Sequence, residues 1–326
     1  MTMDGIFAVN KPSGPSSGDV VSDLKHYFSK SPVFAEDIKK IQGNQPPSKR
    51  KKKKNQFIKI GHGGTLDPLA SGVLVIGIGA GTKKLGDYLG SCTKTYRAKA
   101  LFGTSTDTYD SQGKIVDRAS VKHLTNEKVE KALEKFRGDI LQTPPVYSAL
   151  KMNGKPLYEY ARSGEELPKE IKPRECKIDS LEVVGGGLVY EHEFKHPETE
   201  ASEQEKKYSH ILNKLDKQSS VLKEGEENSE DSSAEEVDLS SSPILEIKFS
   251  VSSGTYIRSL IHDIGLELGT TAHMVELTRE VQGPWELNTN VFEITDFTKR
   301  DPEKWEPELR HYLDNGPNTP LKEVRN

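Results

Sequence analysis

The sequence predicts an α+β fold. Apolar residues recur at helical spacing in three segments, residues 17–29, 125–137 and 256–268. Short apolar runs, several of them interrupted by glycine, lie between these segments and are typical of strands. Because helices and short strands interleave along the 326 residues without an internal repeat, a mixed α+β architecture is expected.

The strands are expected where the apolar runs are short. Residues 5–10 (GIFAVN) predict the first strand. Residues 73–79 (VLVIGIG) predict a buried strand, because their apolar positions do not alternate with polar ones. Residues 94–103 (KTYRAKALFG) predict a more exposed strand. Further strands are expected near residues 139–149 and 176–184 and in a segment that ends at Val251.

The helices follow from apolar spacing and from their end signals. The helix over residues 125–137 should close at Gly138. The helix over residues 256–268 should follow directly on the strand that ends at Val251. In the first helix one apolar face is expected, made of Val20, Val21, Leu24 and Phe28.

Two segments have the composition of insertions. Residues 30–56 lack periodicity and contain the basic run KRKKKK at 49–54, so a flexible basic insertion is predicted. The basic run is either a solvated linker or a nuclear localisation or RNA-contacting arm. Residues 190–242 contain ten serines and many glutamates, which predicts a disordered acidic insertion.

Net charge and cysteine content limit the function classes. The formal net charge is -4, but the basic and acidic insertions oppose each other and the remaining chain is near neutral, so any RNA site must be a local cluster of charge. Two cysteines cannot form a disulfide framework, which fits a reducing compartment. No apolar run reaches the roughly 20 residues of a membrane span, and neither a secretory signal nor a transit peptide is expected at the N-terminus.

Two motifs resemble cofactor sites but lack the required context. HEFKH at 192–196 fits the H-E-x-x-H zinc signature, yet Pro197 follows at once and the surroundings are acidic and serine-rich. GIGAGTK at 77–83 lacks the spacing of a phosphate-binding loop. Neither a metal site nor a nucleotide cofactor is therefore expected.

The candidate catalytic residue is Asp67 in GHGGTLDPLASG (61–72). Pro68 keeps Asp67 out of helical geometry, and the glycines around it could make it a simple turn residue. GTYIRSL at 254–260, however, supplies Arg258 at the start of a helix, and an Arg can hold an Asp in its charged form. The residues alone therefore permit a carboxylate nucleophile or base and name no substrate.

An ordered series of motifs resembles the TruB family of standalone tRNA pseudouridine-55 synthases. The series begins with Lys11-Pro12, continues through the Asp67 loop, and ends with GTYIRSL and AHMVELTR (272–279). The motifs between them are KTYRA (94–98), TDTYDSQGKIV (106–116), FRGDI (136–140), YSALK (147–151) and LYEYAR (157–162). The resemblance implies the pseudouridine synthase fold, a mixed and largely antiparallel sheet with flanking helices and a central active-site cleft.

The resemblance also implies a role for each matching residue. Asp67 would be the catalytic aspartate, Tyr96 would stack on the target uracil and share in proton handling, and Arg258 would pair with Asp67. Such an enzyme must extrude the uridine from a stacked loop, and an aromatic face recovers part of that cost. Substrate-binding roles fall to Tyr256, which would line the pocket, Leu277, which would pack on the uracil, and His62, which would fill the space that flipped bases leave. Contacts to RNA phosphates are expected from Lys11, Lys83 and Lys94.

The organisation that follows is a catalytic domain over residues 1–300, interrupted by the two insertions, and a C-terminal tail over 301–326 without an evident RNA-binding PUA domain. No cofactor and no metal are expected. The expected partner is tRNA, bound at its T-arm, with messenger RNA as a further candidate. We expect a monomer that neither associates with a membrane nor needs an obligatory protein partner. The charged insertions favour the nucleus over the cytoplasm or the mitochondrion.

Two other functions stay open. The first is a guide-RNA-dependent synthase of the dyskerin type acting on ribosomal RNA. The catalytic loop of that family, however, resembles DPKVTG, whereas this chain has DPLASG at residues 67–72. The second is an RNA-binding chaperone that folds tRNA without catalysis. Release of tritium from C5-labelled uridine in a naked tRNA transcript would separate both from the expected enzyme.

Overall fold

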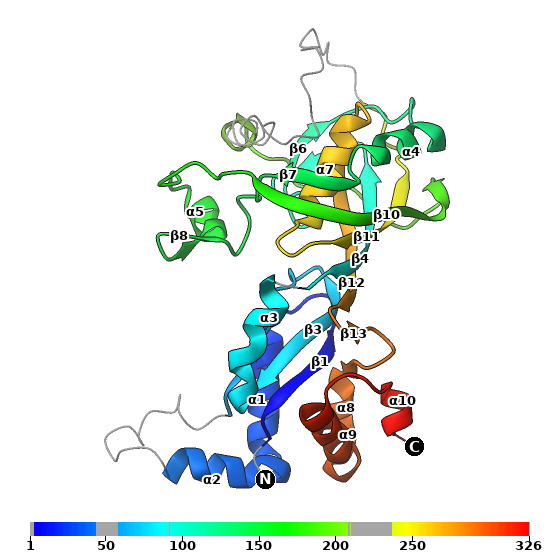
Figure 1. Cartoon of the computed structure of the whole chain (residues 1–326). Helices are drawn as coiled ribbons and strands as arrows, with labels where there is room; N and C mark the ends of the chain where they lie inside the picture. The colour runs from blue at the N-terminus through cyan, green and yellow to red at the C-terminus, as the bar shows by residue number, and fades with distance from the viewer. Residues whose placement is uncertain (1–2, 44–57, 91, 208, 210–236, 326) are drawn as a thin grey trace. The chain divides into compact units, whose positions relative to one another are not determined.

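The structure is a computed structural model that describes residues 3–43, 58–90, 92–207, 209 and 237–325. The chain divides into two compact units (Figure 1). Unit 1 comprises Met1–Thr95 and Thr278–Asn326, and unit 2 comprises Tyr96–Leu277. The single domain predicted over residues 1–300 is thus two units, and the C-terminal segment belongs to the first.

Unit 1 is built on a mixed sheet. Strand β1 (Gly5–Lys11) pairs antiparallel with β3 (Ser71–Ile78) and parallel with β14 (Phe292–Glu293). On the other side of β3 lies β12 (Ala272–Gln282), paired in parallel through Thr278 and Arg279. The short strands β2 (Ile60–His62) and β13 (Trp285–Glu286) pair with β3 and β12. The buried strand predicted over residues 73–79 is confirmed by β3.

Helix α1 (Ser17–Lys30) begins at a capping box between Ser16 and Asp19, and its buried face contains the four apolar residues predicted for it. The flexible insertion predicted from residue 30 is wrong over its first part, because a 3₁₀ turn (Pro32–Phe34) and helix α2 (Ala35–Gly43) follow. The fully buried Phe34 ring stacks on Phe28 at 4.7 Å between centroids. The basic run at 49–54 lies outside the described residues.

The C-terminal tail predicted over residues 301–326 is also wrong. Helices α8 (Ile294–Lys299), α9 (Pro302–Asn315) and α10 (Leu321–Val324) pack into unit 1. Trp305 and Leu309 on α9 are fully buried. Their spacing of four residues is a helical signal that the many charges around them obscured.

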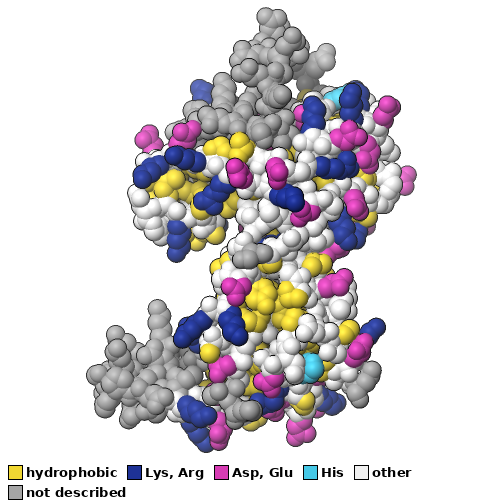
Figure 2. All heavy atoms as spheres, viewed as in Figure 1, with side chains coloured by type: hydrophobic (Ala, Val, Ile, Leu, Met, Phe, Trp, Pro, Cys, Tyr) yellow, Lys and Arg dark blue, Asp and Glu magenta, His cyan; other side chains and the backbone are white. Residues whose placement is uncertain are grey.

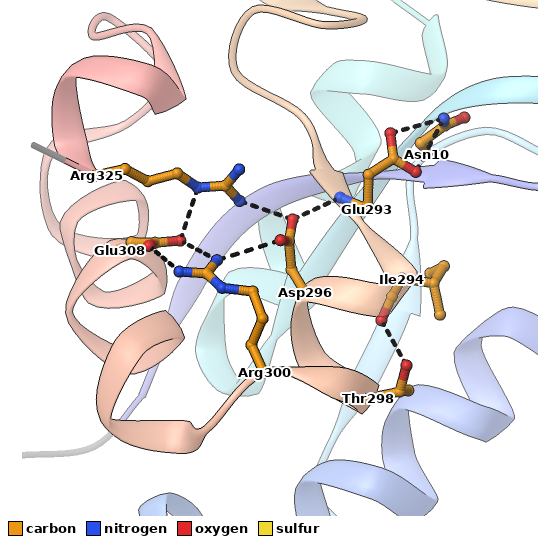
Figure 3. A network of polar contacts seen from close by, with 8 residues as sticks. All are labelled: Asn10, Glu293, Ile294, Asp296, Thr298, Arg300, Glu308 and Arg325. Carbon is orange, nitrogen blue, oxygen red and sulfur yellow. Dashed lines mark hydrogen bonds and ion pairs between the residues drawn. The ribbon is translucent and has the colours of Figure 1, made fainter.

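Two buried carboxylates hold these C-terminal helices together (Figure 3). Arg300 binds Glu308 at 2.5 Å and Asp296 at 3.2 Å. Arg325 reaches the same two carboxylates at 3.1 and 2.7 Å. Both Glu308 and Asp296 are buried, and each carboxylate is paired with two guanidinium groups.

Unit 2 has strands in the order β12-β4-β11-β10-β7. Strand β10 (Arg174–Val189) pairs antiparallel with β11 (Ile244–Val251) and with β7 (Gly138–Gln142). Strand β4 (Lys94–Phe102) alternates half-buried and buried residues before ending fully buried. The strands predicted near 139–149 and 176–184 and the strand that ends at Val251 are confirmed, and β10 extends further than predicted.

The helices of unit 2 are α4 (Asn126–Glu134), α5 (Leu157–Ser163) and α7 (Ile257–Glu267). Helix α4 stops at Lys135, and Gly138, predicted to close it, begins strand β7. Unit 2 also contains the hairpins β5 (Thr104–Thr106) with β6 (Ile115–Arg118) and β8 (Lys151–Met152) with β9 (Lys155–Pro156). Among the described residues no helix has both the length and the apolar character of a membrane span.

The acidic insertion is ordered at its start, so the disorder predicted from residue 190 is wrong for residues 190–207. Ile115 donates its N–H to Thr199 O and accepts from Ala201 N, both at 2.8 Å, which places the segment beside β6. Ala201 is buried there. Low average hydropathy concealed this short stretch, which backbone bonds and the buried Ala201 help to attach to unit 2. Residues 208 and 210–236 lie outside the described residues.

Candidate functional site

Asp67 lies half-buried in the loop between β2 and β3. The residues on both sides of it are fixed through their backbone. Ser17 Oγ accepts from Leu66 N at 2.8 Å and donates to Leu66 O at 3.0 Å, and Gly14 N donates to Pro68 O at 2.8 Å. The start of α1 and the turn before it therefore hold the loop in place, as an active-site loop on a rigid scaffold requires.

Lys11 at the end of β1 holds the same loop through hydrogen bonds to backbone carbonyls. Its Nζ donates to Ala70 O at 2.6 Å, to Pro12 O at 2.9 Å and to Pro68 O at 3.3 Å. The side chain is fully buried and its three donors are occupied. The phosphate contact predicted for Lys11 is therefore wrong, because the ammonium group positions the loop instead.

Burial lowers the pKa of Lys11 from 10.5 to about 8, and the nearby Asp67 carboxylate opposes that shift. Arg279 adds to the lowering. Lys11 and Asp67 are thus electrostatically linked within unit 1. Ionised Asp67 favours the charged form of the lysine that holds its loop.

Two residues of β12 also support the loop, and neither was predicted as a site residue. Arg279 is buried and donates to Val73 O at 2.7 Å and to Gly64 O at 3.0 Å. Gln282 donates to Gly63 O at 2.5 Å. The Arg279 backbone passes so close to Gly72 that a Cβ there would lie 2.2 Å from Arg279 O, which explains the glycine. Arg279 ends the AHMVELTR motif, so that motif was the available signal.

The other predicted residues of unit 1 differ in exposure. His62 ends β2 half-buried, and burial, followed by the charge of Arg279, lowers its pKa and favours the neutral imidazole. Lys94 is buried, and its Nζ lies 3.4 Å from Cys92 O. Burial lowers the pKa of Lys94, which disfavours the predicted phosphate contact. Lys83 is exposed on the 3₁₀ segment η3 (Gly79–Lys84), ahead of helix α3 (Leu85–Gly90), and its role stays a prediction.

Arg258 lies in unit 2 on the first turn of α7, where the sequence placed it. Its guanidinium is buried and donates to Thr108 O at 2.6 Å and to Tyr147 O at 2.8 Å. The Asp110 carboxylate lies 3.5 Å from Nη1. The motifs TDTYDSQGKIV and YSALK supply these three partners, none of which was predicted as a site residue. The pairing of Arg258 with Asp67 stays a prediction.

The remaining predicted residues of unit 2 lie on three elements. Tyr256 caps α7 half-buried, and Gln142 fixes its backbone by accepting from Tyr256 N at 2.7 Å and donating to Tyr256 O at 3.0 Å. Tyr96 on β4 and Leu277 on β12 are buried, with exposed fractions of 8% and 6%. Their packing against an extruded uracil stays a prediction.

The HEFKH motif has no zinc-protease geometry, because residues 192–196 are not helical. His192 Nε2 lies 2.8 Å from Ser242 O, and His196 Nδ1 lies 2.8 Å from Thr104 Oγ1. Within the described part of the chain no group of three His, Cys, Asp or Glu side chains could hold a metal ion. The two histidines instead fasten the start of the insertion to unit 2.

Basic side chains gather around α5 in unit 2 (Figure 2). The exposed ones are Lys151, Arg162, Lys169 and Lys172. Exposed glutamates lie in the same stretch, at Glu159, Glu165, Glu166 and Glu170, so the basic side chains alternate with acidic ones and do not form a uniformly positive surface.

The known proteins that the chain resembles in sequence are pseudouridine synthases. The family model described as TruB family pseudouridylate synthase (N terminal domain) matches residues 50–205. The chain is 43% identical to tRNA pseudouridine synthase 4 of Saccharomyces cerevisiae over 96% of this chain and 86% of that protein. It is 38% identical to the protein of the same name in Schizosaccharomyces pombe, over 94% and 84%. It is 33% identical to human pseudouridylate synthase TRUB1, over 92% and 67%.

Solved structures agree in fold. The archaeal box H/ACA sRNP Nop10-Cbf5 complex matches with a TM-score of 0.50 at 20% identity, and a Cbf5-Nop10-Gar1 complex with 0.51 at 21%. Each comparison covers 98% of this chain, which spans 61% of the matched chain. The predicted α+β fold is confirmed by this likeness and by the mixed sheet.

Proposed function

We infer that Asp67 is the catalytic carboxylate of this chain, which belongs to the TruB family of pseudouridine synthases and is a tRNA pseudouridine synthase. The substrate consistent with this family is the T-loop uridine at position 55. The observation that carries the inference is the support of the Asp67 loop. Lys11, Ser17 and Arg279 hold its backbone, so the carboxylate sits on a fixed base.

The reaction explains why such a group is needed. The N1–C1′ glycosidic bond breaks, the uracil turns, and a C5–C1′ bond forms, while C5 loses its proton and N1 gains one. A carboxylate can add to the base or to the sugar and so divide the isomerisation into easier steps. Tyr96 and Leu277 would pack on the extruded uracil, Tyr256 would line its pocket, and His62 would fill the space left by flipped bases. Arg258 would keep Asp67 ionised.

Three lysines were predicted to contact RNA phosphates. Lys11 and Lys94 are buried, which disfavours such a contact, whereas Lys83 is exposed and remains a candidate. Each such contact makes tRNA affinity fall as salt rises.

The testing experiment measures tritium release from C5-labelled uridine in a naked tRNA transcript. Wild type should release label from position 55. Asp67→Asn should lower the rate on the order of 10³-fold or more, as loss of a nucleophile does, while tRNA affinity stays within about threefold. Asp87→Asn, an exposed aspartate on α3, serves as the matched control and should react like wild type. Equal release by wild type and Asp67→Asn would refute the assignment.

The two alternatives make different demands. A guide-RNA-dependent synthase would leave the naked transcript unmodified until a guide RNA is added. A chaperone would refold tRNA equally well with Asp67→Asn, so that variant separates folding activity from catalysis. The identity to proteins named tRNA pseudouridine synthase over most of their length supports the standalone enzyme.

We further propose a monomer that works without an obligatory protein partner, that also accepts messenger RNA, and that resides in the nucleus. The KRKKKK run supports the last point, because basic clusters of this length act as nuclear localisation signals. Replacing its six residues by Ser should move a fluorescent fusion out of the nucleus. Cytoplasmic or mitochondrial fluorescence of the wild-type fusion would refute the nuclear location. Light scattering tests the monomeric state, and the tritium-release assay on messenger RNA transcripts tests the additional substrate.

A further inference from the structure

The ordered start of the acidic insertion lies against the turn that holds Arg258. This turn, Asp107–Lys114, supplies Thr108 O and the Asp110 carboxylate to the guanidinium. It connects β5 to β6, and residues Thr199–Lys206, here called the brace, run beside β6. All of these contacts lie within unit 2.

Backbone bonds and a buried side chain attach the brace. Ile115, the residue directly after the turn, exchanges two 2.8 Å backbone bonds with Thr199 and Ala201. Ala201 is 4% exposed, so the strand-like pairing is packed as well as bonded. Glu200 pairs with Arg118 at the far end of β6.

Charge links the brace to the turn itself. Glu205 binds Lys114 Nζ at 2.7 Å, and Lys114 N donates to Asp107 Oδ1 at 2.8 Å. Tyr147 OH lies 3.5 Å from Asp107 Oδ2, and the carbonyl of Tyr147 is the second acceptor of Arg258. Burial raises the pKa of Asp107, and the Glu205 charge adds to that shift, so the brace is within electrostatic reach of the turn.

We propose that the brace is a positioning element for Arg258, acting through the Asp107–Lys114 turn that grips the guanidinium. This inference rests on the proposed function, because it matters only if Arg258 serves the reaction. The opposing view is that β12 holds the turn without help from the brace. Met274 on β12 already accepts from Ser111 N at 2.9 Å and donates to Tyr109 O at 3.0 Å.

The test uses the full chain with Ala201→Pro, which removes the N–H that Ile115 O accepts. At saturating tRNA the single-turnover rate should fall on the order of tenfold, since a small misplacement of a reacting group is costly, while the Kd for tRNA stays within about twofold. Ala201→Ser keeps the N–H and should react like wild type. Replacing residues 210–236 by a Gly/Ser linker of equal length should also leave the rate unchanged.

A charge exchange gives a second readout if Ala201→Pro fails to fold. Lys114→Glu and Glu205→Lys should each lower the rate about two- to fivefold, as loss of an exposed ion pair allows, and together they should restore it. Such rescue is not expected of residues that only stabilise the fold independently.

The proposal is overturned if Ala201→Pro keeps the wild-type rate while trypsin newly cuts at Lys206 and Lys207, showing that the brace is released. It is also overturned if only the Kd changes, or if the linker replacement lowers the rate as much as Ala201→Pro. Absence of tritium release from the wild type at position 55 would instead refute the proposed function.

Discussion

The Nζ of Lys11 donates to Ala70 O at 2.6 Å from a fully buried side chain, so an ammonium group at the end of β1 fixes the loop that carries Asp67. The charge of Asp67 in turn favours the protonated lysine. Lys11 therefore acts on the backbone of the loop that carries the proposed catalytic Asp67, and not on RNA.

Replacing this lysine should damage catalysis more than binding. Lys11→Met removes the Nζ that donates to the carbonyls of Pro12, Pro68 and Ala70, so the Asp67 loop loses one of its supports. We expect the single-turnover rate to fall roughly ten- to hundredfold, with the Kd for tRNA little changed. Lys84→Met, an exposed lysine of the same unit, is the control. A large loss of affinity at an unchanged rate would contradict the positioning role.

The same lysine should give stability a pH dependence. Its pKa is about 8 in the folded chain against 10.5 for an ordinary lysine, so between these values the unfolded chain binds more protons. The free energy of unfolding should therefore rise as pH increases from about 8 towards 10.5. Urea unfolding of wild type and Lys11→Met across this range measures the difference. If that difference does not grow with pH, the folded-state pKa of Lys11 is not lowered.

Arg258 should be needed both for stability and for the reaction. Arg258→Met leaves the buried Asp110 carboxylate without its guanidinium neighbour, which should cost about 3–5 kcal/mol of unfolding free energy. Adding Asp110→Asn should recover part of that stability but none of the activity, because the loss of catalysis follows the guanidinium. Recovery of activity by the double variant would show that Arg258 is only structural.

The fold and the site were predictable to different depths. The buried face of α1 followed from spacing, because Val20, Val21, Leu24 and Phe28 lie on one side of any helix through them. Asp67 followed from its motif. The role of Lys11 could not, since nothing local shows that its Nζ reaches carbonyls 57 and 59 residues later in the chain.

The two insertions that were predicted to be flexible and the predicted C-terminal tail share one feature. Phe34, Ala201 and Trp305 are buried residues in these segments, and averaged composition hides them. Each is held by contacts with residues distant in sequence, which are set by the tertiary fold. Sequence periodicity therefore located the regular elements, whereas the packed parts of the insertions and the C-terminal helices required coordinates.

The C-terminal helices offer a matched pair of variants on α9. Glu308 is buried between Arg300 and Arg325, so Glu308→Ala should lower the unfolding free energy by about 3 kcal/mol. Arg310→Ala breaks only the partly exposed pair with Glu306 at 2.7 Å and should cost at most about 1 kcal/mol. Urea unfolding measures both. Equal effects would mean that the network in Figure 3 contributes no more than a surface ion pair.

His196 of the HEFKH motif should make the fold sensitive to acid, and zinc should not affect stability. Burial lowers the pKa of His196 from 6.5 to about 4, and the neighbouring His273, Arg118 and His192 add to the shift. Thr104 Oγ1 lies within hydrogen-bond distance of Nδ1 of both His196 and His273, at 2.8 and 3.1 Å.

Between pH 6.5 and about 4 the unfolded chain therefore binds more protons than the folded one, and stability should fall as pH falls through that window. His196→Gln should make the fall shallower, with His26→Gln on the exposed face of α1 as the control. Added zinc should leave the melting temperature of wild type unchanged, because His192 and His196 face separate partners, Ser242 O and Thr104 Oγ1. A zinc-dependent rise that His196→Gln abolishes would show that the two histidines do bind metal.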